Sequence, residues 1–342
     1  MEILSIRGFK AVLYFWSGLI RNVTAGRLIN YLKLRLSYHL AGFQKHPRHW
    51  GFPVAVSVEP TTACNLQCPE CPTGRGTLQR PAGKLSIEQF DYYLQKLPRE
   101  VSWLTFYFQG EPFLNRNFID MVKLAKKRRM IVTTSTNGHF LNLENATKAI
   151  ESGLDKIIIS LDGADADTYL NYRKGGSFDK VVEGIKQLTA KKKELGSHKP
   201  LVCIQFLVFK QNEHQLEAMT LLSRELGADV LEFKTAQHYD FEEGSPYMTS
   251  LDKYSRYRLA GNGKYAIKNK LHNRCWRMWS SSVITWDGKV VPCCYDKDAS
   301  YCFGNLQESG FEEIWKGAEA DKFRRQLLHS RKDIEICRNC HE

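Results

Sequence analysis

The sequence EPTTACNLQCPEC, residues 59–71, places three thiols within eight positions, at Cys64, Cys68 and Cys71. Thiolates spaced C-x3-C-x2-C on one short loop can hold three corners of a cubane iron–sulfur cluster. A structural zinc site requires four ligands, and no fourth Cys or His lies nearby in the sequence. We therefore expect a cluster with one open iron. A zinc knuckle that borrows a distant fourth ligand is the alternative.

The cysteine loop stands near the start of a repeating pattern of short strands and helices. Helices are expected between the strands and after the capping box of Ser86 and Gln89. Six apolar segments rich in β-branched or aromatic residues predict buried parallel strands: residues 54–59, 103–108, 131–135, 156–161, 201–208 and 230–233. Six such units in residues 51–235 predict an α/β fold, a partial (β/α)6 TIM-like barrel whose working residues lie in loops after the strands.

Polar motifs follow three of these strands, where a barrel places its functional residues. The second strand leads into Gln109-Gly110-Glu111-Pro112, in which the glycine permits close approach and the carboxylate can accept from an ammonium group. Asn137 follows the third strand, and Ser160 and Asp162 end the fourth. Asn-Gly and Asp-Gly are also ordinary turn dipeptides. Arg173, further along, could pair with a carboxylate or belong to a solvated basic turn.

Residues 236–342 carry a second group of cysteines. The segment before them, up to residue 272, is polar and is expected to be a linker or a substrate-facing loop. Residues 282–292 predict a hairpin around Asp287-Gly288. Four thiols suffice for one fully ligated cluster or for a tetrahedral zinc site: Cys275, Cys293, Cys337 and Cys340. Cys294 could replace Cys293 as a ligand, whereas Cys203, inside an apolar strand, is expected to be a buried small hydrophobe.

The loop of residues 59–71 resembles that of the radical S-adenosylmethionine (SAM) enzymes, in which C-x3-C-x2-C follows the first barrel strand. The resemblance implies that Cys64, Cys68 and Cys71 hold a [4Fe–4S] cluster whose open iron binds SAM. It implies that Gln109, Gly110, Glu111 and Pro112 correspond to a motif that holds the SAM amino group. Contacts to the SAM carboxylate, ribose or adenine are implied for Asn137, Ser160, Asp162 and Arg173.

The C-terminal cysteines resemble the SPASM/Twitch extension of the same enzymes. This resemblance implies an auxiliary [4Fe–4S] cluster on Cys275, Cys293, Cys337 and Cys340, in a small α+β domain. The family cleaves SAM reductively to a 5′-deoxyadenosyl radical, which abstracts a substrate hydrogen. The auxiliary cluster would accept or relay electrons, and a low-potential donor such as flavodoxin or ferredoxin would supply them.

Two substrate classes follow from the resemblance. Dehydrogenation of a small alcohol or sugar-like molecule is favoured, and modification of a ribosomal peptide or protein side chain is the alternative. Glu232 and Lys234 end the sixth strand, so their side chains are expected at the mouth of the barrel. One of them could orient the substrate or take its proton after hydrogen abstraction.

The N-terminal 50 residues form a basic amphipathic helical arm. The chain of 342 residues has a net charge of +12, and residues 1–50 hold eight Lys or Arg against one acid, Glu2. The arm could pack on the barrel or on a second subunit, or contact an anionic membrane; nucleic acid is less expected, since no RNA-binding motif accompanies the charge. Because thiolate ligands need reducing conditions, a cytoplasmic location is expected, with a membrane-peripheral one as the alternative.

Composition bounds the remaining alternatives. With 43% apolar and 25% charged residues the chain can fold around a core, which excludes a wholly disordered protein. The longest apolar runs are too short for a bundle of membrane-spanning helices. A hypothesis from another class is a non-catalytic, zinc-stabilised protein that binds a membrane or nucleic acid through the basic arm. It predicts zinc in place of iron and no SAM cleavage.

Overall fold

A single ten-stranded sheet runs through the computed structural model, which describes residues 2–5 and 9–340. Its strand order is β1-β7-β6-β5-β4-β3-β2-β10-β11-β12. Six neighbouring strands pair in parallel: β2 (Ala55–Val58), β3 (Trp103–Phe106), β4 (Ile131–Thr136), β5 (Lys156–Ser160), β6 (Leu201–Val208) and β7 (Val230–Thr235). The six strands predicted from the sequence are confirmed, each to within two residues at either end.

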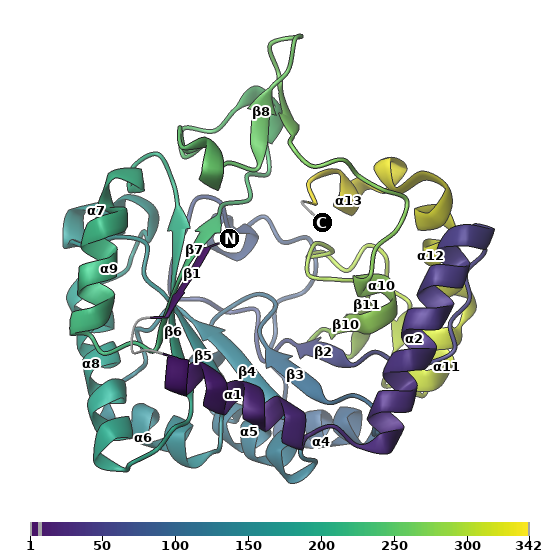
Figure 1. Ribbon diagram of the computed structural model, residues 1–342, viewed down its shortest axis with the longest axis horizontal. Coiled ribbons are helices and arrows are strands. Elements are labelled where there is room, and N and C mark those ends of the chain that lie inside the picture. The colour runs from purple at the N-terminus through teal and green to yellow at the C-terminus, as the bar shows by residue number, and fades with distance from the viewer. Residues whose placement is uncertain (1, 6–8, 341–342) are drawn as a thin grey trace.

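Helices cover the outer face of this curved sheet, as Figure 1 shows. Those that follow the parallel strands are α3 (Pro72–Arg75), α4 (Ile87–Lys96), α5 (Phe118–Lys127), α6 (Leu143–Glu151), α7 (Ala166–Tyr172), α8 (Phe178–Glu194) and α9 (Leu216–Glu225). The capping box predicted at Ser86 and Gln89 opens α4. The arrangement confirms a partial (β/α)6 barrel.

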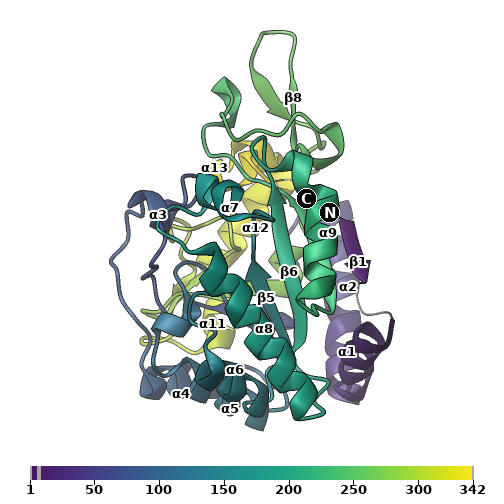
Figure 2. The ribbon, with the colours of Figure 1, turned by 90° about the vertical axis from the view of Figure 1, so that its left-hand side faces the viewer.

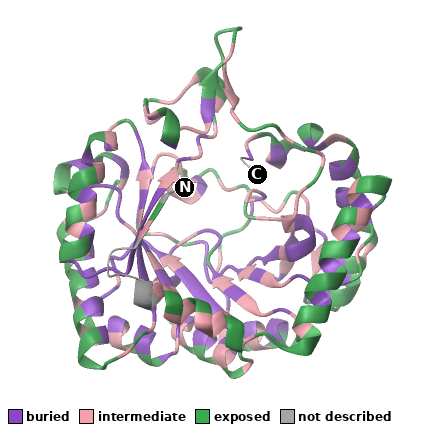
Figure 3. Ribbon diagram, in the orientation of Figure 1, coloured by how far each residue is buried: buried purple, intermediate pink, exposed green. Residues whose placement is uncertain are grey.

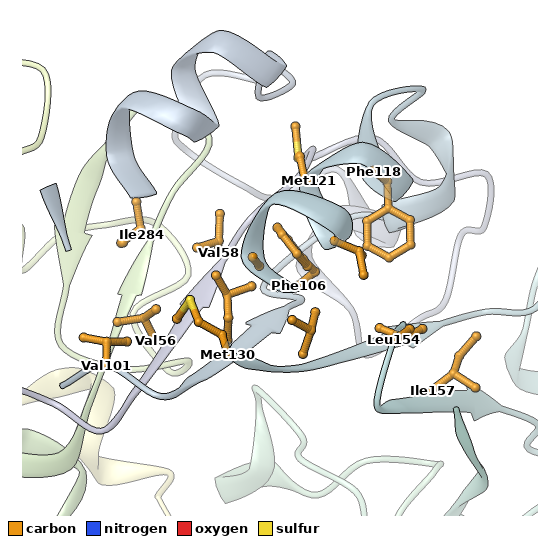
Figure 4. Packing of buried hydrophobic residues seen from close by; sticks show 14 of the residues in the cluster. Val56, Val58, Val101, Phe106, Phe118, Met121, Met130, Leu154, Ile157 and Ile284 are labelled. Carbon is orange, nitrogen blue, oxygen red and sulfur yellow. The ribbon is translucent and has the colours of Figure 1, made fainter. Parts of the chain in front are cut away.

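The two faces of the strands differ because side chains alternate along each strand. Val56, Val58, Phe106 and Ile157 point outward and are buried against the helices, where Phe118 of α5 also packs (Figure 4). Each fully buried apolar side chain of this kind contributes about 1.5–3 kcal/mol. The alternate residues face the inside of the barrel, here called the lumen, and many of them are polar.

The N-terminal segment closes one end of the barrel. Strand β1 (Glu2–Ser5) pairs antiparallel with β7 at the sheet edge. Helix α1 (Phe9–Arg21) packs Val12 and Phe15 against an apolar cluster at the starts of β6 and β7, and the Phe15 ring meets Trp103 edge-on at 5.8 Å. Helix α2 (Ala25–Gln44) follows. Both helices therefore pack on the barrel, one of the arrangements expected for the basic arm, whereas β1 was not predicted.

The C-terminal cysteine region extends the same sheet. Strand β10 (Ser281–Ile284) pairs in parallel with β2 and antiparallel with β11 (Lys289–Val291), which confirms the predicted hairpin. The remaining elements of this region are α10 (Arg277–Ser280), β12 (Gly304–Asn305), α11 (Phe311–Lys316), α12 (Ala318–Ser330), η5 (Arg331–Asp333) and α13 (Glu335–Arg338).

The segment between the barrel and the cysteine region is more ordered than the expected linker. It forms a second hairpin, β8 (Tyr257–Leu259) with β9 (Tyr265–Ile267), which projects beyond the barrel in Figures 1 and 2. The sequence pattern did not predict this hairpin because each strand has only three residues, too few to display a period of two. Within the described residues, no helix is both long and apolar enough to cross a membrane.

Candidate active site

The first cysteine loop leaves the end of β2 and lies at the mouth of the lumen. Each of its thiols is approached by one of the side chains expected to bind the cofactor. The Asn137 side-chain amide lies 3.8 Å from Cys64 Sγ, the Arg173 guanidinium 3.7 Å from Cys68 Sγ, and the side-chain oxygen Oε1 of Gln109 4.0 Å from Cys71 Sγ. Three separate barrel loops therefore converge on the three cysteines.

Burial raises the pKa of the Cys64 thiol to about 11 and also raises that of Cys68. Thiols in this environment stay protonated at neutral pH until a metal displaces the proton. Ten free cysteines and no disulfide are found in the chain, all of them among the described residues. Three soft sulfur donors on one loop are the donor set that an iron–sulfur cluster requires, so the residues fit the expected group.

Gly110 brings the motif after β3 against the cysteine loop. Its φ of +73° is one that residues with a side chain rarely adopt, and a Cβ atom there would lie 2.2 Å from the Thr61 carbonyl oxygen. The next residue donates from its backbone N–H to the Ala63 carbonyl at 2.8 Å. The glycine is thus needed for both the turn and the close contact.

Glu111 is buried beside this contact. Its carboxylate accepts from Thr136 Oγ1 and from the backbone N–H of Asn137, both at 2.7 Å, and from the N–H of Phe113 at the start of the 3-10 turn η1 (Pro112–Leu114). Desolvation outweighs these donors and raises the pKa of Glu111 to about 7. A cationic amino group at this site would favour the ionised carboxylate.

Asp162 and Arg173, both expected to contact SAM, bind each other. The guanidinium donates to Asp162 Oδ2 at 2.6 Å, and Asp162 Oδ1 accepts from the Leu207 N–H at 2.7 Å. Asp162 has no exposed surface. Its pKa is raised by desolvation, against the opposing effect of the arginine. In this arrangement Arg173 bridges a carboxylate and the Cys68 thiol.

The residues expected to act on the substrate lie on the far wall of the lumen. Glu232 and Lys234 alternate along β7 with Leu231 and Phe233, which belong to the outer core, so both face inward. Glu232 accepts from the Gln205 amide at 2.8 Å. Ser160 of β5 lies opposite Gln205 in the sheet register. These residues form a polar wall but do not contact the cysteine loop.

The C-terminal cysteines gather around one apolar cavity. Cys275, Cys293, Cys337 and Cys340 all line it, together with Arg331. The Arg331 guanidinium lies 3.2 Å from Cys340 Sγ. Burial alone would lower its pKa, but the nearby thiols Cys275, Cys340 and Cys337 together raise it. Four thiols beside a buried cation fit a thiolate-ligated cluster, because the cation offsets part of its negative charge.

Cys294 occupies a different position from its neighbour. It is exposed and lies 3.6 Å from an Arg277 nitrogen, whereas the half-buried Cys293 belongs to the four-thiol cavity. A second cavity, of about 200 Å³, is lined by Cys293, Cys294, Arg277 and lumen-facing residues of β2 and β3. Among the described residues, no group of three His, Cys, Asp or Glu side chains is placed to hold a single metal ion.

Sequence reasoning missed the residues between the two cysteine sites. Tyr107, Tyr239 and Lys297 each interact electrostatically with both Cys71 and Cys294. The Lys297 ammonium lies 5.1 Å from the centre of the Tyr239 ring, and burial lowers its pKa. No motif surrounds these residues, so only the folded chain identifies them.

A hydrogen-bonded chain also connects the two sites. Glu70, between two cysteines of the first loop, binds the His238 ring at 2.9 Å and accepts from Ser245 at 2.7 Å. The His238 carbonyl accepts from the amide of Asn339, which lies between Cys337 and Cys340, at 2.6 Å. Tyr257 Oη donates to the Asn339 side-chain oxygen at 2.8 Å.

Comparisons with known proteins agree with this geometry. Residues 58–222 match the radical SAM superfamily, and residues 275–341 match an iron–sulfur cluster-binding domain, SPASM. Over 298 residues, the chain is 29% identical to the tungsten-containing aldehyde ferredoxin oxidoreductase cofactor-modifying protein of Pyrococcus furiosus, covering 78% of this chain and 82% of that protein. It is 28% identical to the PqqA peptide cyclase of Bradyrhizobium diazoefficiens, with 79% and 75% coverage.

The fold likeness extends to solved structures. Streptococcus suis SuiB bound to the precursor peptide SuiA superposes with a TM-score of 0.62 at 14% identity, covering 89% of this chain and 74% of that one. The two family matches identify an iron–sulfur enzyme whose cofactors are SAM, the SAM-binding cluster and an auxiliary cluster, and not a non-catalytic zinc protein.

Proposed function

Because the chain belongs to the radical SAM superfamily and carries a C-terminal SPASM domain, we propose that it oxidises a substrate held in the lumen between its two cysteine sites. One observation carries this proposal. One cavity is lined both by Cys293 and Cys294 of the second site and by Ser57 and Thr105 of the strands that lead into the first site. A substrate among these side chains would face both clusters.

When bound, SAM and the two clusters supply a 5′-deoxyadenosyl radical that takes one hydrogen atom and an acceptor for the remaining electron. The chain's own residues position the reactants and move the proton. Gln109, Asn137 and Arg173 fix the three thiols of the SAM-binding site. Glu232, or Lys234 beside it on the lumen wall, orients the substrate or accepts the proton that balances the oxidation.

We favour a small hydroxyl-bearing molecule, an alcohol or a sugar-like compound, as the substrate. The lumen wall presents hydrogen-bonding groups at Ser160, Gln205 and Glu232, which suit hydroxyl groups. Loss of a C–H hydrogen atom, an O–H proton and one electron converts such an alcohol to a carbonyl. A low-potential donor such as flavodoxin or ferredoxin supplies the electron that starts each cycle.

A peptide or protein side chain is the second candidate substrate. It is favoured by the 28% identity to the PqqA peptide cyclase over 298 residues. The same lumen residues would then bind one side chain of a polypeptide whose backbone lies at the barrel mouth. Oxidation of that side chain would use the same proton and electron acceptors.

Anaerobic turnover with SAM and a chemical reductant tests the proposal. Deuterated polyols and synthetic peptides are supplied in parallel, and 5′-deoxyadenosine is analysed for deuterium. The proposal requires deuterium transfer from one class and a product that has lost two electrons. The variant Cys340→Ala should form 5′-deoxyadenosine but little oxidised product. A product at the same oxidation level as its substrate would overturn the proposed oxidation.

A further inference from the structure

The exposed apolar side chains of this protein are concentrated near its N-terminus. Of the nineteen large hydrophobic residues exposed in the described part of the chain, eleven lie within the first 43 positions. Single exposed apolar residues are normal on any protein surface, but a concentration of this kind marks an interaction site. The helices concerned, α1 and α2, lie on one side of the molecule, facing the viewer in Figure 1 and on the right in Figure 2.

Helix α2 has two apolar faces with different surroundings. Its inner face is buried on the body of the protein through Leu34 and Ala41. The opposite face carries Leu28, Leu32 and Leu36 at successive intervals of four, with exposed fractions of 50%, 57% and 55%. Ile29 and Phe43 lie beside this stripe, and Phe43 is 86% exposed. The inner contacts therefore fix the helix with an apolar stripe outward.

Helix α1 repeats this arrangement. Val12 and Phe15 point inward and close the lumen, whereas Leu13, Trp16 and Ile20 are 51%, 58% and 73% exposed. The outward residues have the spacing of three and four that places them on one helix face. Figure 3 colours many residues of both helices as exposed. We call the outward residues the N-terminal apolar face: Leu13, Trp16, Ile20, Val23, Leu28, Ile29, Leu32, Leu36 and Phe43.

Basic residues flank this face. The first 50 residues carry eight Lys or Arg and one acid, a net charge of +7. In α2, Lys33 and Arg35 lie on either side of Leu32 and Leu36 in the helical wheel, and Arg35 extends over the Trp276 ring at 5.1 Å. Long basic side chains beside an apolar stripe can reach phosphate groups while the stripe enters the acyl region.

We propose that the N-terminal apolar face binds an anionic phospholipid surface, with α1 and α2 lying in the membrane interface. The charge argues for lipid over a second copy of the chain, because self-association through this face would bring two +7 segments together. An anionic bilayer supplies both the apolar layer and the opposite charge. Since α1 also closes the lumen, the membrane would lie next to the end of the barrel that α1 closes.

Co-sedimentation of the full-length, cluster-loaded protein with vesicles tests this proposal. Vesicles of phosphatidylcholine mixed with phosphatidylglycerol should carry the protein into the pellet, whereas pure phosphatidylcholine and high salt should weaken binding. The variant Leu32→Ser/Leu36→Ser/Phe43→Ser should bind the mixed vesicles more than about tenfold more weakly, since it removes three inserted side chains.

The matched control is Leu143→Ser/Leu195→Ser/Leu221→Ser, which removes three leucines that are 55%, 44% and 58% exposed elsewhere on the surface. It should bind vesicles as the unaltered protein does. Iron content and SAM cleavage in solution should stay unchanged in both variants, which separates this proposal from the proposed oxidation. Equal binding by the two triple variants would overturn the proposal. The proposal would also be overturned if the unaltered protein did not bind anionic vesicles. The same holds if the protein were a dimer that the variant Leu32→Ser/Leu36→Ser/Phe43→Ser dissociated.

Discussion

Arg173 and Asp162 form a buried ion pair at the edge of the first cysteine site, with 2.6 Å between the guanidinium and the carboxylate. The same guanidinium lies 3.7 Å from Cys68 Sγ. Arg173 therefore connects the loop after β5 to the cysteine loop. Its contribution to cofactor binding would come from fixing that thiol as much as from direct contact with SAM.

Removal of both partners of this pair should cost less stability than the two single removals added together. Arg173→Met leaves a fully buried carboxylate with the Leu207 N–H as its remaining neutral donor, and breaking such a pair costs about 3–5 kcal/mol. The double variant Asp162→Asn/Arg173→Met should lose less than the sum of the two single changes. Urea unfolding of the metal-free protein measures this double-mutant cycle. Additive losses would show that the two residues act independently.

Gly110 should be far less tolerant of a side chain than Gly76. Both have positive φ, +73° and +66°, but a Cβ at Gly110 meets the Thr61 carbonyl whereas Gly76 has nothing within 4 Å. Gly76→Ala should cost about 1 kcal/mol and retain iron. Gly110→Ala should also displace the cysteine loop and lower both iron content and SAM affinity. Iron analysis and equilibrium SAM binding compare the two variants, and equal behaviour would contradict this role for Gly110.

Cys293 and Cys294 should differ sharply when substituted. Cys293 lines the cavity with the other three thiols, while Cys294 is exposed beside Arg277. Cys293→Ala should therefore lose about four of about eight irons per chain, the content of one cubane cluster. Cys294→Ala should retain them. Iron analysis and electron paramagnetic resonance of the reduced proteins decide the assignment, and the opposite result would make Cys294 the ligand.

Glu111 should make the metal-free protein less stable as pH rises. Its pKa is raised from 4.5 to about 7, so the folded state holds more protons than the unfolded state between these values. Its contribution is complete below pH 4.5 and is lost as pH rises through about 7. Denaturation midpoints measured from pH 5 to pH 8 should fall less steeply for Glu111→Gln than for the unaltered protein. Parallel curves would assign the pH dependence to other groups.

The sequence alone predicted those features that depend on local patterns. Residues 201–208 are predicted as a strand because their apolar composition is local, and the hairpin because Asp287-Gly288 is a turn dipeptide. Gly288 indeed adopts a φ of +86° there. Partners distant in sequence left no such signal. The pairing of Arg173 with Asp162 depends on the packing of a whole barrel loop. Lys297 and Tyr239 became candidates only when folding brought them near Cys71.

The parallel pairing of β10 with β2 has a consequence for the electron transfer that the proposed oxidation requires. Ser282 lies opposite Val56 and Ile284 opposite Val58, immediately before the first cysteine loop. The distance between the two cysteine sites is therefore set by backbone hydrogen bonds within one sheet and not by a hinge between domains. Under the proposed oxidation, electrons would pass between these sites without a closing motion, so this step should not slow in viscous solvent, unlike steps that depend on domain movement.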